Sequence, residues 1–415
     1  MRVTIVNLFY PPNLAASAHL AASLADHRAA LGDDVTVVCG RGGFLGGAER
    51  GARYTRAASA PTVIRLWTPA LGKATNVRRL GDYVAFLIGA VGRLMLMPRQ
   101  DVVIALTTPP YALVAAVAHQ LLHPRTRVVL WCHDVYPDAA EAFGTIRPGG
   151  FVSRMLRAAS KRLMRRVDHV VAVDDAMLTR ALTGYVRDGS PAGSVIPHWE
   201  PVARFPRGRR SKPWAGYDDV ALADRFVVLH TGNFGVGYRA EGIADAAAIL
   251  ADDQVTFLFV GGGARVPELT AEVERRKLRN VSFHGYVPRS ETAGVLAGAQ
   301  CALISLDNRS LGIISPSKMH SSLAMGLPIV YVGPPGTNVD DAILRYRCGF
   351  SIRQGDVPGI VEAIRRLRDD SGLADELSRN ARRAFEETYS DRSTLPQFDA
   401  LLDGLIPTDR HSVER

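Results

Sequence analysis

The sequence predicts an α/β protein built from two Rossmann-like domains that face each other across a ligand cleft. Three observations predict this fold. The chain has 415 residues, more than one hydrophobic core usually organises. Short apolar segments of strand length alternate with helical segments in two separate series, which is typical of parallel sheets with helices on both faces. A segment rich in Pro, Gly and Arg lies between the two series.

The first series forms the predicted N-terminal domain, residues 1–198. Its strands are apolar runs rich in β-branched residues, which favour extended structure, and its helices follow them in alternation. We expect strands at 3–6, 35–39, 63–67, 102–106, 128–131 and 170–173. We expect helices at 15–31, 77–97, 111–122, 151–166 and 176–182.

The second series forms the predicted C-terminal domain, residues 215–390, after a linker that ends at about residue 214. We expect its strands at 226–230, 256–260, 281–284, 302–305 and 329–332. A helical tail is expected over 357–389 and again over 395–405. Residues 391–415 are predicted to form a C-terminal helix and tail that returns to the N-terminal domain.

The distribution of charge and the spacing of the cysteines indicate a partner and a location for the protein. Residues 1–200 hold 23 Lys and Arg against 14 Asp and Glu, whereas residues 201–415 hold 27 of each. The excess of nine positive charges therefore belongs to the N-terminal half, which indicates a partner for that half. The four cysteines have no paired spacing, so free thiols are expected. No signal peptide and no membrane-spanning run is recognised, which predicts a cytoplasmic protein.

Residues 306–328 connect two predicted strands and read LDNRSLGIISPSKMHSSLAMGLP. Ser315 is a suitable N-cap, Pro316 suits the first helical position, and Gly326 suits the end of a short helix. A helix N-terminus at a strand end offers free N–H groups and a positive dipole end. With Lys318 in the first turn, this predicts a phosphate site. The alternative is an ordinary crossover with a solvated lysine.

Three further loops follow predicted strands of the C-terminal half. In the loop 231–235, Gly232 permits close approach of a diphosphate, to which Asn233 and Arg239 could donate. Gly262 lies in a run of three glycines, and a base could lie against Tyr286 in the next loop. Tight turns without a ligand are the alternative. The spacing is not that of a dinucleotide fingerprint, so NAD is not expected.

Polar residues also follow the predicted strand 128–131. His133 and Asp134 lie at its end, with Asp138 and Glu141 close behind. Such a cluster can orient a hydroxyl nucleophile or accept its proton. Alternatively, Asp134 or Asp138 caps the next helix and His133 packs in the core. No D-x-D carboxylate pair and no Cys/His ligand spacing are found, so no metal site is expected.

The predicted helix 151–166 is basic and contains no acidic residue. Arg154, Arg157, Lys161 and Arg165 fall at helical spacing, and we expect them opposite an apolar face that includes Val152, Met155, Ala159 and Leu163. With Arg78 and Arg79 ahead of the apolar stretch 83–97, this favours an anionic membrane surface as partner. Few aromatic residues are interleaved, so nucleic acid is not expected. The alternative is a solvated basic face.

Together these motifs resemble GT-B glycosyltransferases of family 4, of the exopolysaccharide or O-antigen type, similar to colanic acid and N-acetylfucosamine transferases. The resemblance covers nearly the whole chain. In the C-terminal half it rests on the segments 231–235, 261–263, 283–288, 316–318 and 323–328. In the N-terminal half it rests on 10–12, 108–110, 133–137 and 195–199.

The resemblance implies a retaining transferase of hexosyl or N-acetylhexosaminyl type that needs no metal. It implies transfer from a nucleotide-sugar, with UDP favoured, to a glycan or polyprenyl-linked acceptor at the inner face of the membrane. Carried over to this sequence, the donor side comprises Gly232, Asn233, Tyr286, Val287, Ser317 and Lys318. His133 and Asp134 then lie on the acceptor side.

The sequence departs from the family pattern at the donor site. Ser321 stands where many members have a ribose-binding glutamate, and Ile313 replaces the acidic residue eight positions earlier. Asn233 and Glu241 stand at two positions that are commonly basic, so Arg239 and Lys318 are left to neutralise the diphosphate. Two alternatives follow: a sugar-nucleotide epimerase of the same fold, or an inactive sugar-nucleotide-binding protein.

Overall fold

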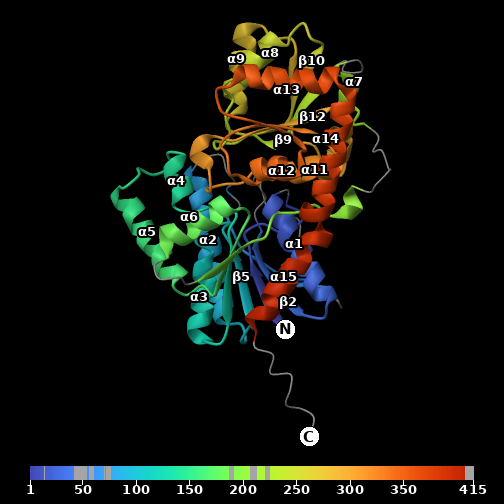
Figure 1. The fold of residues 1–415 in the computed structure, drawn as a ribbon. Helices are drawn as coiled ribbons and strands as arrows, with labels where there is room; N and C mark the ends of the chain where they lie inside the picture. Colours follow the sequence, from blue (N-terminus) through green and yellow to red (C-terminus); the bar gives the residue numbers. More distant parts are fainter. Residues whose placement is uncertain are drawn as a thin grey trace. The chain divides into compact units, whose positions relative to one another are not determined.

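The computed structural model describes residues 1–13, 15–41, 54–55, 60–69, 71, 76–186, 191–205, 213–219 and 225–406. The chain divides into two compact units (Figure 1). Unit 1 comprises Met1–Ile196 with Leu395–Arg415, and unit 2 comprises Pro197–Thr394. Parts of the predicted linker (206–212) and of the predicted tail (407–415) lie outside the described residues.

Unit 1 contains a sheet in the order β3-β4-β2-β1-β5-β6-β7-β8. Every pairing is parallel except that of β3 with β4. The central strands are apolar and fully buried because helices cover both faces. The strands are β1 (Arg2–Val6), β2 (Asp34–Gly40), β3 (Tyr54–Thr55), β4 (Thr62–Leu66), β5 (Val102–Leu106), β6 (Arg127–Trp131), β7 (His169–Ala172) and β8 (Ala192–Val195).

The helices of unit 1 lie between these strands, and the C-terminal helix joins them. Phe398 and Leu402 of α15 are fully buried, and the ring of Phe398 packs edge-on to Trp131 at 4.8 Å between centroids. The expected return of this helix to the N-terminal domain is therefore confirmed. The helices are α1 (Ala16–Ala30), α2 (Asn76–Met95), α3 (Leu113–Leu122), α4 (Asp138–Ala142), α5 (Phe151–Met164), α6 (Asp175–Tyr185) and α15 (Asp391–Leu405).

Unit 2 contains a parallel sheet in the order β11-β10-β9-β12-β13-β14. Its strands are β9 (Phe226–Asn233), β10 (Val255–Gly262), β11 (Val281–His284), β12 (Cys301–Ser305), β13 (Ile329–Val332) and β14 (Gly349–Ile352). Its helices are α7 (Gly216–Asp219), α8 (Ile243–Ile249), α9 (Val266–Arg276), α10 (Thr292–Ala297), α11 (Lys318–Met325), α12 (Asn338–Tyr346), α13 (Val357–Asp369) and α14 (Ser371–Ala384). The predicted α/β class with two parallel-sheet domains is confirmed.

Two helix predictions need correction. The expected helical tail over 357–389 is divided at Asp370, whose side chain caps α14 by accepting the Leu373 N–H. The helix after β12 begins at Lys318 and not at Pro316. A proline disfavours helical backbone at the residue before it, and the N-cap is Ser317, whose carbonyl accepts the His320 N–H at 3.3 Å. Within the described residues, no helix is long and apolar enough to cross a membrane.

Candidate functional site

Glycines bring the ends of β9 and β10 together in unit 2. Gly232 pairs with Gly261, and Asn233 pairs with Gly262. Gly232 and Gly261 have φ angles of +83° and +141°, and a Cβ at Gly261 would collide with the Gly232 carbonyl. Side chains are therefore excluded here, and backbone groups line the edge of the sheet where ligands of such folds bind.

An aromatic ring lies beside this glycine backbone. A Cβ on Gly262 would lie 2.8 Å from the ring of Tyr286, so the missing side chain lets the ring pack closely. The Tyr286 hydroxyl donates to Oδ1 of Asn233 at 3.4 Å, and the residue is 40% exposed. Four predicted donor residues therefore lie together: Gly232, Asn233, Gly262 and Tyr286. Val287 packs against the core instead.

Lys318 approaches the same loop from the interior. It is nine-tenths buried, its Nζ donates to the Asn233 carbonyl at 3.3 Å, and the Nζ lies 3.7 Å from the centroid of the Tyr238 ring. Burial lowers the pKa of Lys318 to about 7. The alternative of a solvated lysine is therefore wrong, because this amine supports the loop after β9.

The remaining predicted donor residues have other partners. Arg239 forms an ion pair with Glu241, and its Nη1 lies 3.6 Å from Oδ2 of Asp307. Ser321 is buried and its hydroxyl donates to the Lys318 carbonyl at 3.2 Å, within the same helix. Ser317 is exposed at the helix start. Asp307, which we did not predict as a site residue, therefore lies beside Arg239 in this part of the site.

In unit 1, the predicted acceptor residues follow β6. The backbone N–H groups of His133 and Asp134 both donate to Oγ1 of Thr107 at 3.0 Å, which fixes the loop to the end of β5. The His133 ring packs against Trp131 at 5.1 Å, and burial lowers its pKa to about 3. The imidazole is therefore neutral at pH 7. Asp134 is half-buried and has the more accessible side chain.

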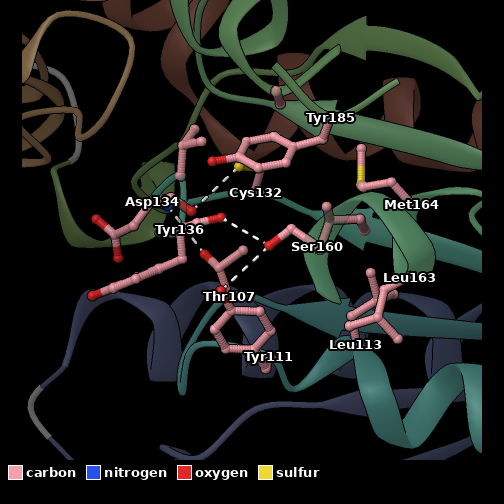
Figure 2. Close-up of a pocket in the computed structure, with 13 residues that line it drawn as sticks. Thr107, Tyr111, Leu113, Cys132, Asp134, Tyr136, Ser160, Leu163, Met164 and Tyr185 are labelled. Carbon is pink, nitrogen blue, oxygen red and sulfur yellow. Dashed lines mark hydrogen bonds between the residues drawn. The ribbon is translucent and has the colours of Figure 1, made fainter. Parts of the chain in front are cut away.

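Asp134 lines a pocket formed by β6, α3, α5 and α6 (Figure 2). Hydroxyls in this pocket already have protein acceptors: that of Tyr111 donates to the Leu156 carbonyl at 3.3 Å, and that of Ser160 to the Tyr136 carbonyl at 3.2 Å. Apolar side chains form much of the remaining wall: Leu113, Leu130, Leu163 and Met164. Asp134 is a polar group at this pocket, whereas His133 is not among its lining residues.

The other two carboxylates near β6 belong to an internal network. Asp138 accepts from the Tyr185 hydroxyl and pairs with Arg180 at 3.1 Å. Glu141 forms an ion pair with Arg157, which also lies 3.5 Å from Asp138. The expectation that Asp138 and Glu141 face the ligand is therefore corrected. They hold α4, α5 and α6 together.

The surface of α5 also differs from the prediction. Arg157 is drawn into the network by two carboxylates, so it is not part of the exposed basic face. Val152 and Met155 were expected on the opposite face, yet they are 48% and 54% exposed, beside Phe151 at 75%. The exposed surface of α5 therefore combines these apolar groups with basic ones: Arg154, Lys161, Arg162 and Arg165.

Comparison with known sequences adds two family matches. Residues 16–199 match the glycosyl transferase 4-like domain, and residues 225–370 match glycosyl transferases group 1. A putative colanic acid biosynthesis glycosyl transferase, WcaI of Escherichia coli K12, is 26% identical over 341 residues, 79% of this chain and 82% of the relative. WbjE of Pseudomonas aeruginosa, a probable glycosyltransferase, is 25% identical, covering 67% of this chain and 68% of its own.

Solved structures with the same fold extend the comparison. Sucrose-phosphate synthase from Thermosynechococcus elongatus has a TM-score of 0.72 at 15% identity, covering 97% of this chain and 98% of its own. The Anabaena protein HepE, solved with UDP and glucose, has a TM-score of 0.69 at 16% identity, covering 97% and 100%. WaaG, a glycosyltransferase of lipopolysaccharide biosynthesis, has the same TM-score, identity and coverage as HepE.

Proposed function

Because this chain is a GT-B glycosyltransferase of family 4, we propose that it transfers a sugar from a UDP-sugar, with retention, to a hydroxyl of a lipid-linked glycan in cell-surface polysaccharide biosynthesis. One observation supports the donor most strongly. Gly232, Asn233, Gly262 and Tyr286 form a glycine-lined edge beside an aromatic ring, with Lys318 under the loop. Close backbone approach and a cation suit the diphosphate of a nucleotide, and an aromatic surface suits its base.

The same arrangement suggests how charge on the leaving group is stabilised. As the sugar–phosphate bond breaks, negative charge grows on the diphosphate, and groups already in place stabilise it without reorganising. The N-terminus of α11 and the Lys318 amine are such groups. The buried amine has a pKa of about 7, and a bound diphosphate raises that pKa, so donor binding favours the charged form.

On the acceptor side, we assign Asp134 to orient the attacking hydroxyl. Its backbone is held by Thr107, and it lines the pocket of Figure 2. His133 is neutral and packed on Trp131, so we assign it to position the loop. In a front-face retaining reaction, the departing phosphate takes the proton of the acceptor hydroxyl, and Asp134 needs only to align that hydroxyl.

We further propose that unit 1 docks on anionic lipid through α5. Basic residues near such a surface each contribute about 1 kcal/mol, and the exposed Phe151 and Met155 can enter the headgroup region. This would bring the enzyme to a lipid-linked acceptor, whose sugar is presented at the bilayer surface.

A donor screen followed by a transfer assay tests the function. Thermal shifts against UDP-, GDP- and dTDP-sugars select the nucleotide, and we expect stabilisation by UDP-sugars. The selected donor is then incubated with a polyprenyl-linked acceptor, and a glycosylated product with retained configuration is expected. Conversion of the donor sugar without any acceptor would support the epimerase alternative. Binding without conversion under either condition would contradict the transferase.

A further inference from the structure

A buried carboxylate holds two arginines at the edge of the unit 2 sheet. Asp307 follows β12, and its Oδ1 and Oδ2 accept from Nε and Nη2 of Arg309 at 3.1 and 2.9 Å. Oδ1 also accepts the Arg309 backbone N–H at 2.9 Å. Arg239 lies 3.6 Å from the same carboxylate. One buried group therefore fixes the positions of two guanidinium groups.

This cluster is attached to the loop after β9, where the donor is proposed to bind. The Asp307 backbone N–H donates to the Gly237 carbonyl at 2.9 Å, and the Ser310 hydroxyl donates to the same carbonyl at 3.0 Å. Burial by itself raises the pKa of Asp307, but the hydrogen bonds from Arg309 outweigh it and hold the pKa below its usual value. The carboxylate is therefore ionised at neutral pH, and Arg309 is held beside the loop that carries Asn233.

Arg309 retains donors for a ligand. Its side chain is 57% exposed, and the contacts with Asp307 use the Nε and Nη2 edge. A guanidinium has a second edge, formed by Nη1 and the other N–H of Nη2, that can bind another oxyanion. Arg309 therefore presents guanidinium donors that Asp307 does not use, next to the loop after β9.

We propose that Arg309, held by Asp307, binds an oxyanion of the donor that lies beyond the nucleoside monophosphate. The oxyanion is the β-phosphate or a carboxylate on the transferred sugar, as in a hexuronate. This inference rests on the proposed nucleotide-sugar donor. It makes Arg309 a specificity-determining residue and Asp307 the residue that positions it.

Titration calorimetry with Arg309→Gln tests the proposal. The ligands are the nucleoside monophosphate, the diphosphate, and its glucose and glucuronate conjugates, with the base that the donor screen selects. If the β-phosphate is bound, affinity falls roughly tenfold for the last three ligands and not for the monophosphate. If a sugar carboxylate is bound, the fall is confined to the glucuronate conjugate. Either pattern supports the subsite.

Two variants serve as controls. Arg275→Gln removes an exposed, ion-paired arginine elsewhere on unit 2, and all four affinities should match wild type. Arg309→Lys keeps the charge but loses the paired N–H donors of the guanidinium, so it should recover only part of the affinity. Affinities in Arg309→Gln equal to wild type for every ligand would overturn the subsite alone. A wild-type protein that binds no nucleotide would overturn the proposed function, and this inference with it.

Discussion

Lys318 shows how strongly one residue depends on its surroundings. An amine in the first turn of a helix is usually solvated, but this one is nine-tenths buried against Tyr238 and the Asn233 carbonyl. Its pKa is lowered from 10.5 to about 7 by burial. Burial makes the charged form of the amine unfavourable in free energy, and a bound diphosphate would compensate this.

This environment predicts a pH-dependent stability. Between about pH 7 and 10.5 the unfolded chain binds the Lys318 proton and the folded chain does not, so the free energy of unfolding should rise with pH. Lys318→Met should remove that rise and weaken donor binding roughly tenfold or more. Urea denaturation across this pH range and donor titration measure both effects.

The control for Lys318 is Lys277→Asn. Lys277 is exposed with a φ of +55°, a conformation that asparagine tolerates, so the change removes a charge without strain. It should leave both measurements unaltered. A Lys318→Met variant with the pH slope and donor affinity of wild type would remove Lys318 from the site.

Asp134 and Asp138 are four residues apart and should respond differently to the same change. Asp134→Asn should lower kcat far more than donor affinity, because its carboxylate lines the proposed acceptor pocket. Asp138→Asn should instead lower the melting temperature, because Arg180 and Arg157 lose a charged partner. Steady-state kinetics and thermal denaturation of both variants test this. Loss of donor affinity in Asp134→Asn with unchanged kcat would place it on the donor side.

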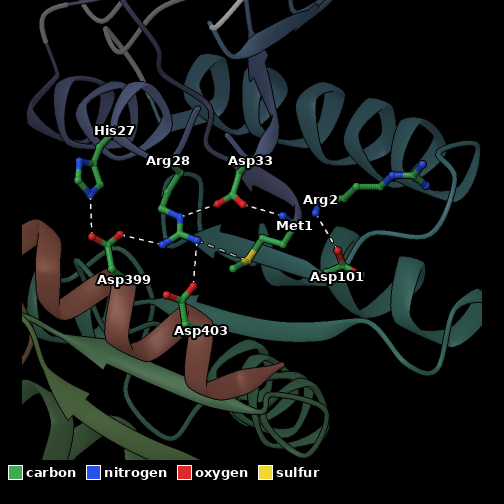
Figure 3. Close-up of polar contacts among 8 residues, drawn as sticks. All are labelled: Met1, Arg2, His27, Arg28, Asp33, Asp101, Asp399 and Asp403. Carbon is green, nitrogen blue, oxygen red and sulfur yellow. Dashed lines mark hydrogen bonds and ion pairs between the residues drawn. The ribbon is translucent and has the colours of Figure 1, made fainter. Parts of the chain in front are cut away.

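Among the elements, α15 depends on a charge cluster for its attachment to unit 1 (Figure 3). Arg28 of α1 is 4% exposed and contacts Asp33 at 2.6 Å, Asp399 at 2.8 Å and Asp403 at 3.1 Å. His27 lies 2.8 Å from Asp399 as well. Three carboxylates therefore share one buried guanidinium.

Removing that guanidinium should destabilise unit 1. Arg28→Met leaves partly buried carboxylates without their main cation, which costs roughly 3 kcal/mol in the free energy of unfolding. Arg99→Met is the matched control, because its 3.5 Å pair with Asp101 is half-exposed and should contribute less than about 1 kcal/mol. Urea denaturation measures both. Equal losses in the two variants would show that the cluster does not stabilise the attachment of α15.

For the whole molecule, the excess of positive charge in the N-terminal half predicts that unit 1 binds an anionic membrane surface. Wild type should sediment with anionic vesicles, should not sediment with neutral ones, and should be released in high salt. A variant with Glu at Arg154, Lys161, Arg162 and Arg165 should stay in solution, and it spares Arg157 because that residue stabilises α5. Glu at four exposed arginines of unit 2, Arg279, Arg345, Arg366 and Arg392, is the control and should sediment. Sedimentation of the α5 variant at wild-type level would contradict membrane docking.

The sequence alone determined the fold class and most of the strands. The strands 102–106 and 329–332 were predicted to the residue, because runs of buried β-branched side chains leave few alternatives to a parallel sheet. Gly232, Gly262 and Tyr286 were predicted as candidate site residues because residues that follow parallel strands gather at one edge. The short strands β3, β8 and β14 were missed, because two to four residues carry too little periodicity.

Only the tertiary structure decided which charged side chains form internal ion pairs and which remain accessible to a ligand. Asp134, Asp138 and Glu141 look alike in the sequence, yet two of them pair with arginines that come from α5 and α6. Arg157 matches Arg154 and Lys161 in helical spacing, yet carboxylates hold it inward. Lys318 is buried by Tyr238, which lies 80 residues earlier in the chain. The free energy of a charge depends on burial and on partners distant in sequence, and neither can be read from local spacing.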